Sequence, residues 1–163
     1  MPVTLGAARP EEMTTVLRLL EANGLPTAGL SDHWNTTTVA RDAGRIVGSA
    51  ALELYPDGAL LRSVAVEPSM HGRGLGRELV TAALDMARER GVEAIYLLTT
   101  TAEAFFRRFG FSRITRAEVP TLVQKSVEFT SACPSSAVVM RKVLVRDTRR
   151  TDDLEETHAR STQ

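Results

Sequence analysis

The stretch HGRGLGRELV, residues 71–80, constrains this fold more than any other, because it places three glycines directly before a helical pattern. Glycine in or beside regular structure costs roughly 0.5–1 kcal/mol relative to alanine, so the cluster needs a compensating use. The preceding run LLRSVAVEP, residues 60–68, is mostly apolar and has the character of a strand. The sequence therefore predicts a strand, a glycine turn and a helix in direct succession.

The helix after the glycines is predicted over 74–90, with Gly91 as its stop. Its apolar positions form one stripe, Leu75, Leu79, Ala83 and Met86. The first amides of a helix lack intrahelical acceptors and carry positive partial charge, so a glycine turn at this end indicates an anion site. Two nucleotide motifs do not fit: Arg77 stands where the dinucleotide fingerprint has its third glycine, and the lysine and hydroxyl of a P-loop are absent.

The rest of the chain alternates between strand and helix patterns. The predicted elements are a strand at 3–8, a helix at 9–24, three antiparallel strands within 36–68, a strand at 93–100, a helix at 101–110, a polar helix over roughly 118–130 and a strand at 136–145. Thr100 and Glu103 have the spacing of a capping box for the helix at 101–110. The pattern indicates an α/β (α+β) class.

Composition narrows the kind of protein. The chain of 163 residues is 43% hydrophobic, so we expect one domain over 1–145, followed by a flexible charged tail at 146–163. Lys plus Arg is 20 and Asp plus Glu is 20, which argues against nucleic acid or membrane as the partner. The single cysteine, Cys133, rules out an internal disulfide, and no metal is predicted. The sequence pattern indicates neither an apolar leader nor a membrane span, so we expect a soluble, cytoplasmic protein.

Two stretches carry a family resemblance. VAVEPSMHGRGLGRELV, followed one helix and one strand later by AFFRRFGF, resembles the acetyl-CoA signature of the GNAT family of N-acetyltransferases. LLTTTAEAFFRRFGF and EFTSACPSSAVVM resemble the subgroup containing N-acetylglutamate synthase-like domains and the acetyltransferases found with arsenic-resistance genes. The resemblance implies a single mixed, mostly antiparallel sheet, splayed between its fourth and fifth strands and flanked by helices.

The resemblance also implies where acetyl-CoA, the co-substrate, would bind. Backbone amides of the glycine turn would hold the diphosphate, and strands 59–66 and 94–99 would diverge to admit the pantetheine. The amide of Val64 or Ala65 would polarise the thioester carbonyl, as an oxyanion hole does. The expected acetyl-CoA contacts are Val64, Ala65, Val66, His71, Gly72, Arg73, Gly74, Leu75, Gly76, Arg77, Thr101, Phe105 and Phe106. His71 departs from the Arg or Gln usual at its position.

The amine acceptor must lose a proton before it attacks, which calls for a base. Glu53 stands where family members often carry one, and Val64 completes the expected catalytic pair. Pairing across the YPDG turn would place Glu53 opposite Leu60 and diagonal to Arg62, so an ion pair between Glu53 and Arg62 is an equal alternative. The expected substrate contacts are Arg62, Ser63, Thr99 and Lys125, with Arg62 or Lys125 meeting a carboxylate.

Two functions remain open at this point. The first is an acyltransferase enzyme that passes acetyl from acetyl-CoA to a small amine, an amino acid or a similar compound, by direct attack in a ternary complex. The second is an acetyl-CoA-binding sensory or interaction module with little catalysis, suggested by Phe106, which stands where many family members have a tyrosine proton donor. Resemblance also makes a homodimer possible.

Overall fold

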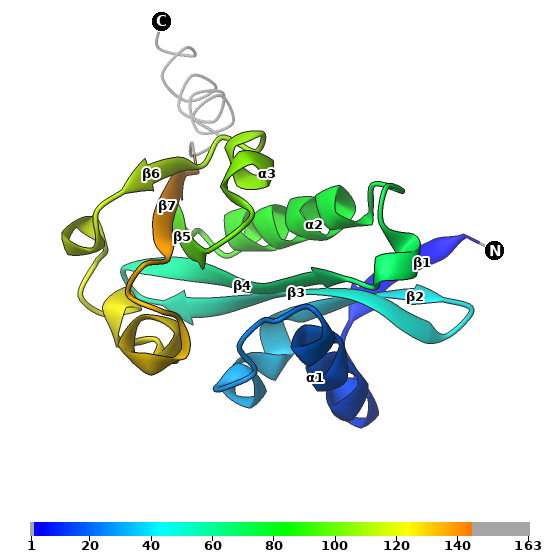
Figure 1. The fold of residues 1–163 in the computed structure, drawn as a ribbon. Coiled ribbons are helices and arrows are strands. Elements are labelled where there is room, and N and C mark those ends of the chain that lie inside the picture. Colours follow the sequence, from blue (N-terminus) through cyan, green and yellow to red (C-terminus); the bar gives the residue numbers. More distant parts are fainter. Residues whose placement is uncertain (1, 145–163) are drawn as a thin grey trace, which may run out of the picture.

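The computed structural model describes residues 2–144 and places one seven-stranded sheet at their centre (Figure 1). The strands are β1 (Val3–Ala7), β2 (Thr37–Asp42), β3 (Arg45–Tyr55), β4 (Gly58–Val66), β5 (Ala94–Thr99), β6 (Ser112–Ile114) and β7 (Val138–Val143). Their order across the sheet is β1-β2-β3-β4-β5-β7-β6. All neighbours are antiparallel except β4 and β5, which confirms the predicted mixed sheet.

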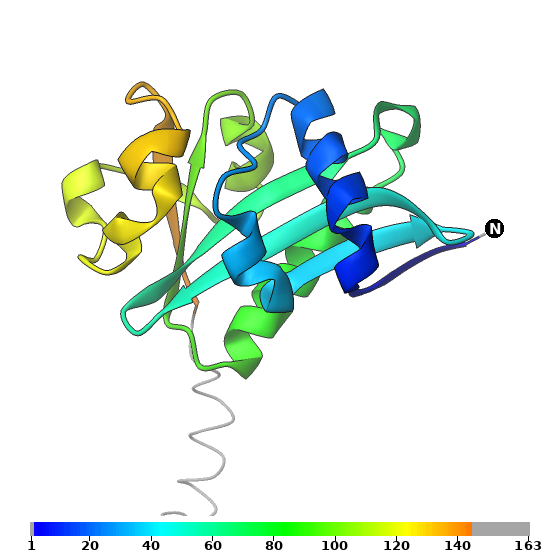
Figure 2. The ribbon, with the colours of Figure 1, turned by 90° about the horizontal axis from the view of Figure 1, so that it is seen from below.

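Helices cover both faces of the sheet because its central strands are apolar on both sides. In β3, Ala50 and Leu52 pack towards α2 (Leu75–Glu89), whereas the intervening Ala51 packs in the cluster of α1 (Met13–Ala22). A 3-10 turn, Pro10–Glu12, precedes α1 and shortens the helix predicted from residue 9. Figure 2 shows α1 and the 3-10 segment Leu30–Thr36 crossing the same face of the sheet.

The segment between β6 and β7 is not the polar helix that the sequence predicts. It contains short helical turns at Arg116–Glu118, Val123–Lys125 and, in the π form, Glu128–Ala132. Pro120 cannot donate a backbone hydrogen bond, and the Gln124 side chain donates to the carbonyls of Arg116 and Val119, so the local bonds compete with a continuous helix. Val119 and Val123 still pack on the sheet against Leu60, which keeps this segment on the α1 side of the sheet.

Several other boundaries can be compared with the prediction. The three strands within 36–68, the helix after the glycines and the strand preceding α3 (Glu103–Arg107) are confirmed. The prediction of a capping box formed by Thr100 and Glu103 is wrong. The Thr99 hydroxyl accepts from the Ala102 amide instead, and the Glu103 carboxylate binds Arg107 and Arg113. Strand β6 was not predicted, and the expected tail at 146–163 lies outside the described residues.

The sheet opens between β4 and β5. The two strands pair only at Ala59 with Ile95 and at Leu60 with Tyr96, so their hydrogen-bonded ladder ends at Leu60. A register shift between Ser49 and Ala51 of β3 accompanies a left-handed backbone at Ser63, whose φ is 59°, and marks a bulge in β4. The predicted splay is confirmed, and residues 61–66 form its β4 side.

Within the described residues, no helix combines the length and the apolar character needed to cross a lipid bilayer.

Candidate active site

The glycine turn leads into the N-terminus of α2 with its backbone exposed. Gly72 and Gly74 have φ values of 82° and 80°, a left-handed conformation that glycine adopts without strain. A Cβ added at either position would meet no other atom within 4 Å, so this side of the turn is open. The Glu78 amide donates to the Gly74 carbonyl, so the amides of Leu75, Gly76 and Arg77 in the first turn have no acceptor within the helix.

The β4 edge supplies further main-chain groups. The Glu67 amide donates to Val47 of β3, so Val66, one residue earlier, directs its amide and carbonyl towards the opening. In the described chain, Val64 pairs with no residue of either neighbouring strand. The Val66 carbonyl is 2.8 Å from Nε2 of His71, which donates to it in the Nε2–H tautomer. The ring of His71 thus occupies the carbonyl of Val66, a residue that the sequence analysis expects to contact acetyl-CoA.

A cavity of about 1020 Å³ connects the glycine turn with the opening between β4 and β5. Most predicted site residues line it, from Arg62 to Val66, around the glycine turn, and at Thr99, Thr101, Phe105 and Phe106. Glu53, Arg73 and Lys125 are not among the lining residues. Phe106 is buried and packs edge-on against Phe105 and Phe111, with centroid distances of 5.1 and 5.8 Å.

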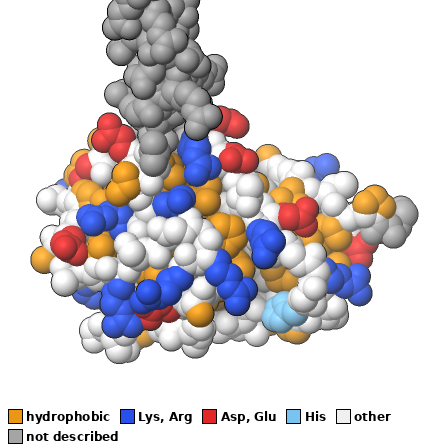
Figure 3. All heavy atoms as spheres, turned by 90° about the horizontal axis from the view of Figure 1, so that it is seen from above, with side chains coloured by type: hydrophobic (Ala, Val, Ile, Leu, Met, Phe, Trp, Pro, Cys, Tyr) orange, Lys and Arg blue, Asp and Glu red, His pale blue; other side chains and the backbone are white. Residues whose placement is uncertain are grey.

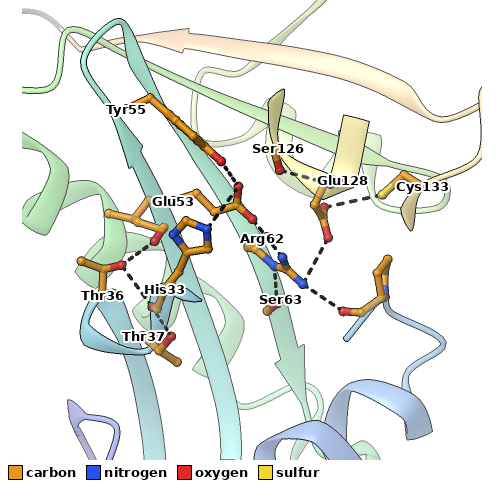
Figure 4. A network of polar contacts seen from close by, with 12 residues as sticks. His33, Thr36, Thr37, Glu53, Tyr55, Arg62, Ser63, Ser126, Glu128 and Cys133 are labelled. Carbon is orange, nitrogen blue, oxygen red and sulfur yellow. Dashed lines mark hydrogen bonds and ion pairs between the residues drawn. The ribbon is translucent and has the colours of Figure 1, made fainter. Parts of the chain in front are cut away.

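Arg62, which lines this cavity, lies between two carboxylates (Figure 4). Its Nη1 donates to Oε2 of Glu53 at 2.9 Å, and its Nη2 lies 3.5 Å from Oε2 of Glu128. Nη2 also donates to the Pro26 carbonyl, and Nε donates to the Ser63 hydroxyl. The Arg62 side chain is fully buried, so these partners replace the water that a guanidinium would otherwise bind.

The predicted strand register is confirmed, because Glu53 pairs with Leu60, and the structure contains the Glu53–Arg62 ion pair that this register favours. The Tyr55 hydroxyl donates to Glu53 Oε1 at 2.5 Å, and His33 Nε2 lies 3.7 Å from the same oxygen. Burial by itself would raise the pKa of Glu53. Hydrogen bonds from Ser126, Tyr55 and Arg62 outweigh that effect and hold the pKa below its ordinary value.

Glu128 belongs to the same cluster, yet its environment differs. Burial raises the pKa of Glu128, and the opposing attraction of Arg62 does not cancel the increase. Its nearest other donor is the thiol of Cys133, with sulfur 3.5 Å from Oε1. Burial and the Glu128 carboxylate raise the pKa of Cys133 to about 12.

Sequence reasoning missed Glu128 as a residue of the cavity wall. Asn23, Leu25 and Pro26 at the end of α1, and Arg108 after α3, line the cavity as well. Glu128 and Arg108 lie within the stretches EFTSACPSSAVVM and AFFRRFGF that carry the family resemblance, but those patterns do not place either side chain in the cavity, because only the fold brings these residues together.

The residues present fit coenzyme A on structural grounds. Open glycine backbone at a helix N-terminus suits a diphosphate, and an unpaired strand edge suits an extended amide-containing arm. Arg77 and Arg108 line the cavity, and Lys and Arg side chains are spread over the face that carries α2 and α3 (Figure 3). Among residues 2–144, no three His, Cys, Asp or Glu side chains lie close enough to hold a metal ion.

The sequence pattern of the acetyltransferase (GNAT) family matches residues 6–111, well over half of the chain. The chain belongs to this family. The region that matches the GNAT family begins in β1, includes the glycine turn and α2, and ends at Phe111.

Among its relatives, the GNAT chain resembles an amino-acid acetyltransferase from Mycobacterium tuberculosis, with 40% identity over 72 residues. This match covers 44% of the chain and 41% of the relative, so the chain spans well under two thirds of that protein's length.

Two solved structures share the GNAT fold of this chain. N-acetylglutamate synthase from Neisseria gonorrhoeae, complexed with coenzyme A and N-acetyl-glutamate, has a TM-score of 0.76 and 22% identity, over 90% of this chain and 36% of that one. Rv2747 from M. tuberculosis, in complex with CoA and NLQ, has a TM-score of 0.75 and 25% identity, over 87% of this chain and 99% of that one. The fold assignment rests on these likenesses together with the observed topology.

Proposed function

We propose that this GNAT protein transfers the acetyl group of acetyl-CoA to the amine of an amino acid. The observation that carries the proposal is the continuous cavity, which joins the open glycine turn to the unpaired β4 edge and ends at a buried cluster of charged side chains. One end of the cavity suits a phosphate-bearing carrier, and the other suits a small zwitterion.

The relatives support the choice of substrate class. The M. tuberculosis relative is named an amino-acid acetyltransferase, and the N. gonorrhoeae synthase was solved with N-acetyl-glutamate. We therefore propose L-glutamate as the first acceptor to test. The predicted link to arsenic resistance and the possible homodimer remain predictions of the resemblance, and the cytoplasmic location remains a prediction from the sequence pattern.

We propose a role for several of the residues that line the cavity. Amides of Gly72 to Arg77 hold the diphosphate, with Arg77 adding a charge. Of the two expected amides, that of Val64 serves the thioester oxygen, because Ala65 pairs with Ser49 of β3. Ser63 and Thr99 line the cavity, and we propose that they contact the acceptor. Arg62 is bound on both sides by carboxylates, so we propose that it orders the pocket, with any contact to a substrate carboxylate made through its remaining donor.

Thiol release tests this function directly. Purified protein is mixed with acetyl-CoA and each of a panel of L-amino acids, and free thiol is followed against reactions without an amine. The expected result is acceptor-dependent thiol release for at least one amino acid, together with calorimetric binding of coenzyme A. Binding of coenzyme A without turnover of any amine would favour the sensory or interaction module instead.

A further inference from the structure

The two buried carboxylates next to Arg62 differ in how fully their oxygens are used. Glu53 accepts from Tyr55 at 2.5 Å and from Arg62 at 2.9 Å, and the Ser126 side chain helps to lower its pKa. Among residues 2–144, the partners of the Glu128 carboxylate are only the Arg62 nitrogen and the Cys133 sulfur, each at 3.5 Å. An ionised carboxylate can accept about four hydrogen bonds. Glu128 can therefore accept additional hydrogen bonds, whereas the oxygens of Glu53 already have close donors.

The two groups also differ in access. Glu128 lines the cavity, whereas Glu53 does not, although the two residues lie on either side of one guanidinium (Figure 4). The Glu128 side chain is only 5% exposed, so any donor that satisfies it must enter through the cavity. A ligand bearing N–H groups is therefore the partner that this carboxylate lacks.

We propose that Glu128 binds the ammonium group of the amino-acid acceptor and removes its proton, acting as the general base of the transfer. This inference rests on the proposed function. It gives Glu53 a different role, that of the ion-pair partner that orients Arg62.

The ammonium gives one proton to a Glu128 oxygen, and the nitrogen lone pair then forms a bond to the thioester carbonyl carbon. The carbon–sulfur bond breaks with its electron pair on sulfur, and the thiolate takes the second proton from the newly acylated nitrogen. The proton on Glu128 leaves to solvent through the cavity, which restores the carboxylate.

The electrostatic surroundings suit this role. The titratable or charged groups that face Glu128 are Arg62 from β4, Cys133 at the end of its own turn, and Glu53 from β3. Burial raises the pKa of Glu128, whereas the pKa of Glu53 is held low, so Glu128 is the stronger base of the two.

The decisive variant is Glu128→Gln, with Glu118→Gln as the matched control because Glu118 is an exposed acid in the same connecting segment. At pH 7 we expect kcat/KM of Glu128→Gln with L-glutamate to fall about 100-fold or more. The deficit should shrink below about tenfold near pH 10, where more of the amine is already neutral in solution. Glu118→Gln should match the wild type throughout.

A binding measurement provides a second readout that does not depend on turnover. In the presence of coenzyme A, calorimetry compares L-glutamate with glutarate, which lacks the amine. The wild type should bind L-glutamate about tenfold more tightly than glutarate, and Glu128→Gln should bind the two alike. Equal discrimination by both proteins, or unchanged kcat/KM in the variant, would overturn the inference while leaving the proposed function intact.

Two further observations cover the case of a misfolded variant. Glu128→Asp keeps the carboxylate and should retain measurable turnover, with a deficit that does not shrink at high pH. The wild-type kcat/KM should fall at acid pH along a limb with an apparent pKa above that of Glu53. A flat acid limb contradicts a base at Glu128, whereas the absence of turnover with every amino acid contradicts the proposed function itself.

Discussion

Arg62 Nη1 lies 2.9 Å from Oε2 of Glu53, and neither side chain is more than 1% exposed. On the other side of the same guanidinium, Glu128 approaches to 3.5 Å and keeps unused acceptor capacity. One buried cation thus faces two carboxylates with different environments, a tightly bonded one outside the cavity and a loosely bonded one on its wall. The pair of acids offers a direct test of how environment divides structural and chemical roles.

The stability of the folded protein should respond oppositely to neutralising the two acids. The folded state lowers the pKa of Glu53 from 4.5, so its ionised form stabilises the fold above that pH, and this contribution is lost as pH falls through the lower value. The folded state raises the pKa of Glu128 from 4.5, so the stability linked to its proton is present below that pH and is lost as pH rises through the raised value.

At pH 7, Glu53→Gln should therefore lower the free energy of unfolding by about 1–3 kcal/mol, as expected for a lost charge-assisted bond. Glu128→Gln should not lower it. Urea unfolding at pH 7 and pH 4 measures both variants, and the Glu53→Gln deficit should be smaller at pH 4. Equal destabilisation by the two variants at pH 7 would contradict the assigned environments.

The glycine turn can be tested with a pair of glycines that share a backbone conformation. Gly74 before α2 and Gly91 after it have φ values of 80° and 74°, and neither has an atom within 4 Å of an added Cβ. Alanine at either site should cost about 1–2 kcal/mol of stability through backbone strain. Only Gly74→Ala should weaken coenzyme A binding, by about tenfold or more in calorimetry, which corresponds to about 1.4 kcal/mol. A similar loss of affinity in Gly91→Ala would place the effect in general stability.

Cys133 should be a poor nucleophile in the folded protein. Its pKa is raised to about 12 by burial and by the Glu128 carboxylate, so at pH 8 its thiolate fraction is about a thousandfold below that of an ordinary cysteine. Iodoacetamide labelling followed by mass spectrometry should be correspondingly slow, and should reach the normal rate in guanidinium chloride. Rapid labelling of the folded chain would show that the thiol is ionised at neutral pH, and would reopen an acyl-cysteine route.

The sequence predicted the parts of the fold that local patterns determine. The strands of the 36–68 region and helix α2 follow from periodicity and turn residues, and the YPDG turn fixes the register that brings Glu53 opposite Leu60. The glycine turn was recognised because its backbone requirement is visible in the residues themselves. These features depend on contacts between residues close in the chain.

The remainder depends on contacts between residues far apart. The turns between β6 and β7 form because Val119 and Val123 pack on the sheet and Gln124 bonds to nearby carbonyls, neither of which appears as a period. Glu128 opens the stretch EFTSACPSSAVVM that carries the resemblance, but it reaches Arg62 only through the fold, so the stretch by itself does not distinguish it from a surface acid. The His71 contact with Val66 was missed for a related reason: it requires the turn after β4 to bring the ring back onto that strand.

The short ladder between β4 and β5 also bears on how the chain behaves in solution. A sheet with this opening has four edges, two outer and two inner, and an exposed flat edge invites pairing with other chains. Here the inner edge of β4 carries a bulge at Ser63 and faces a cavity bounded by the residues after α1 and before β7. A single extended ligand can add to such an edge, whereas the strand of a second protein would have to bring its neighbours with it. The fold thereby keeps an internal hydrogen-bonding edge without inviting aggregation.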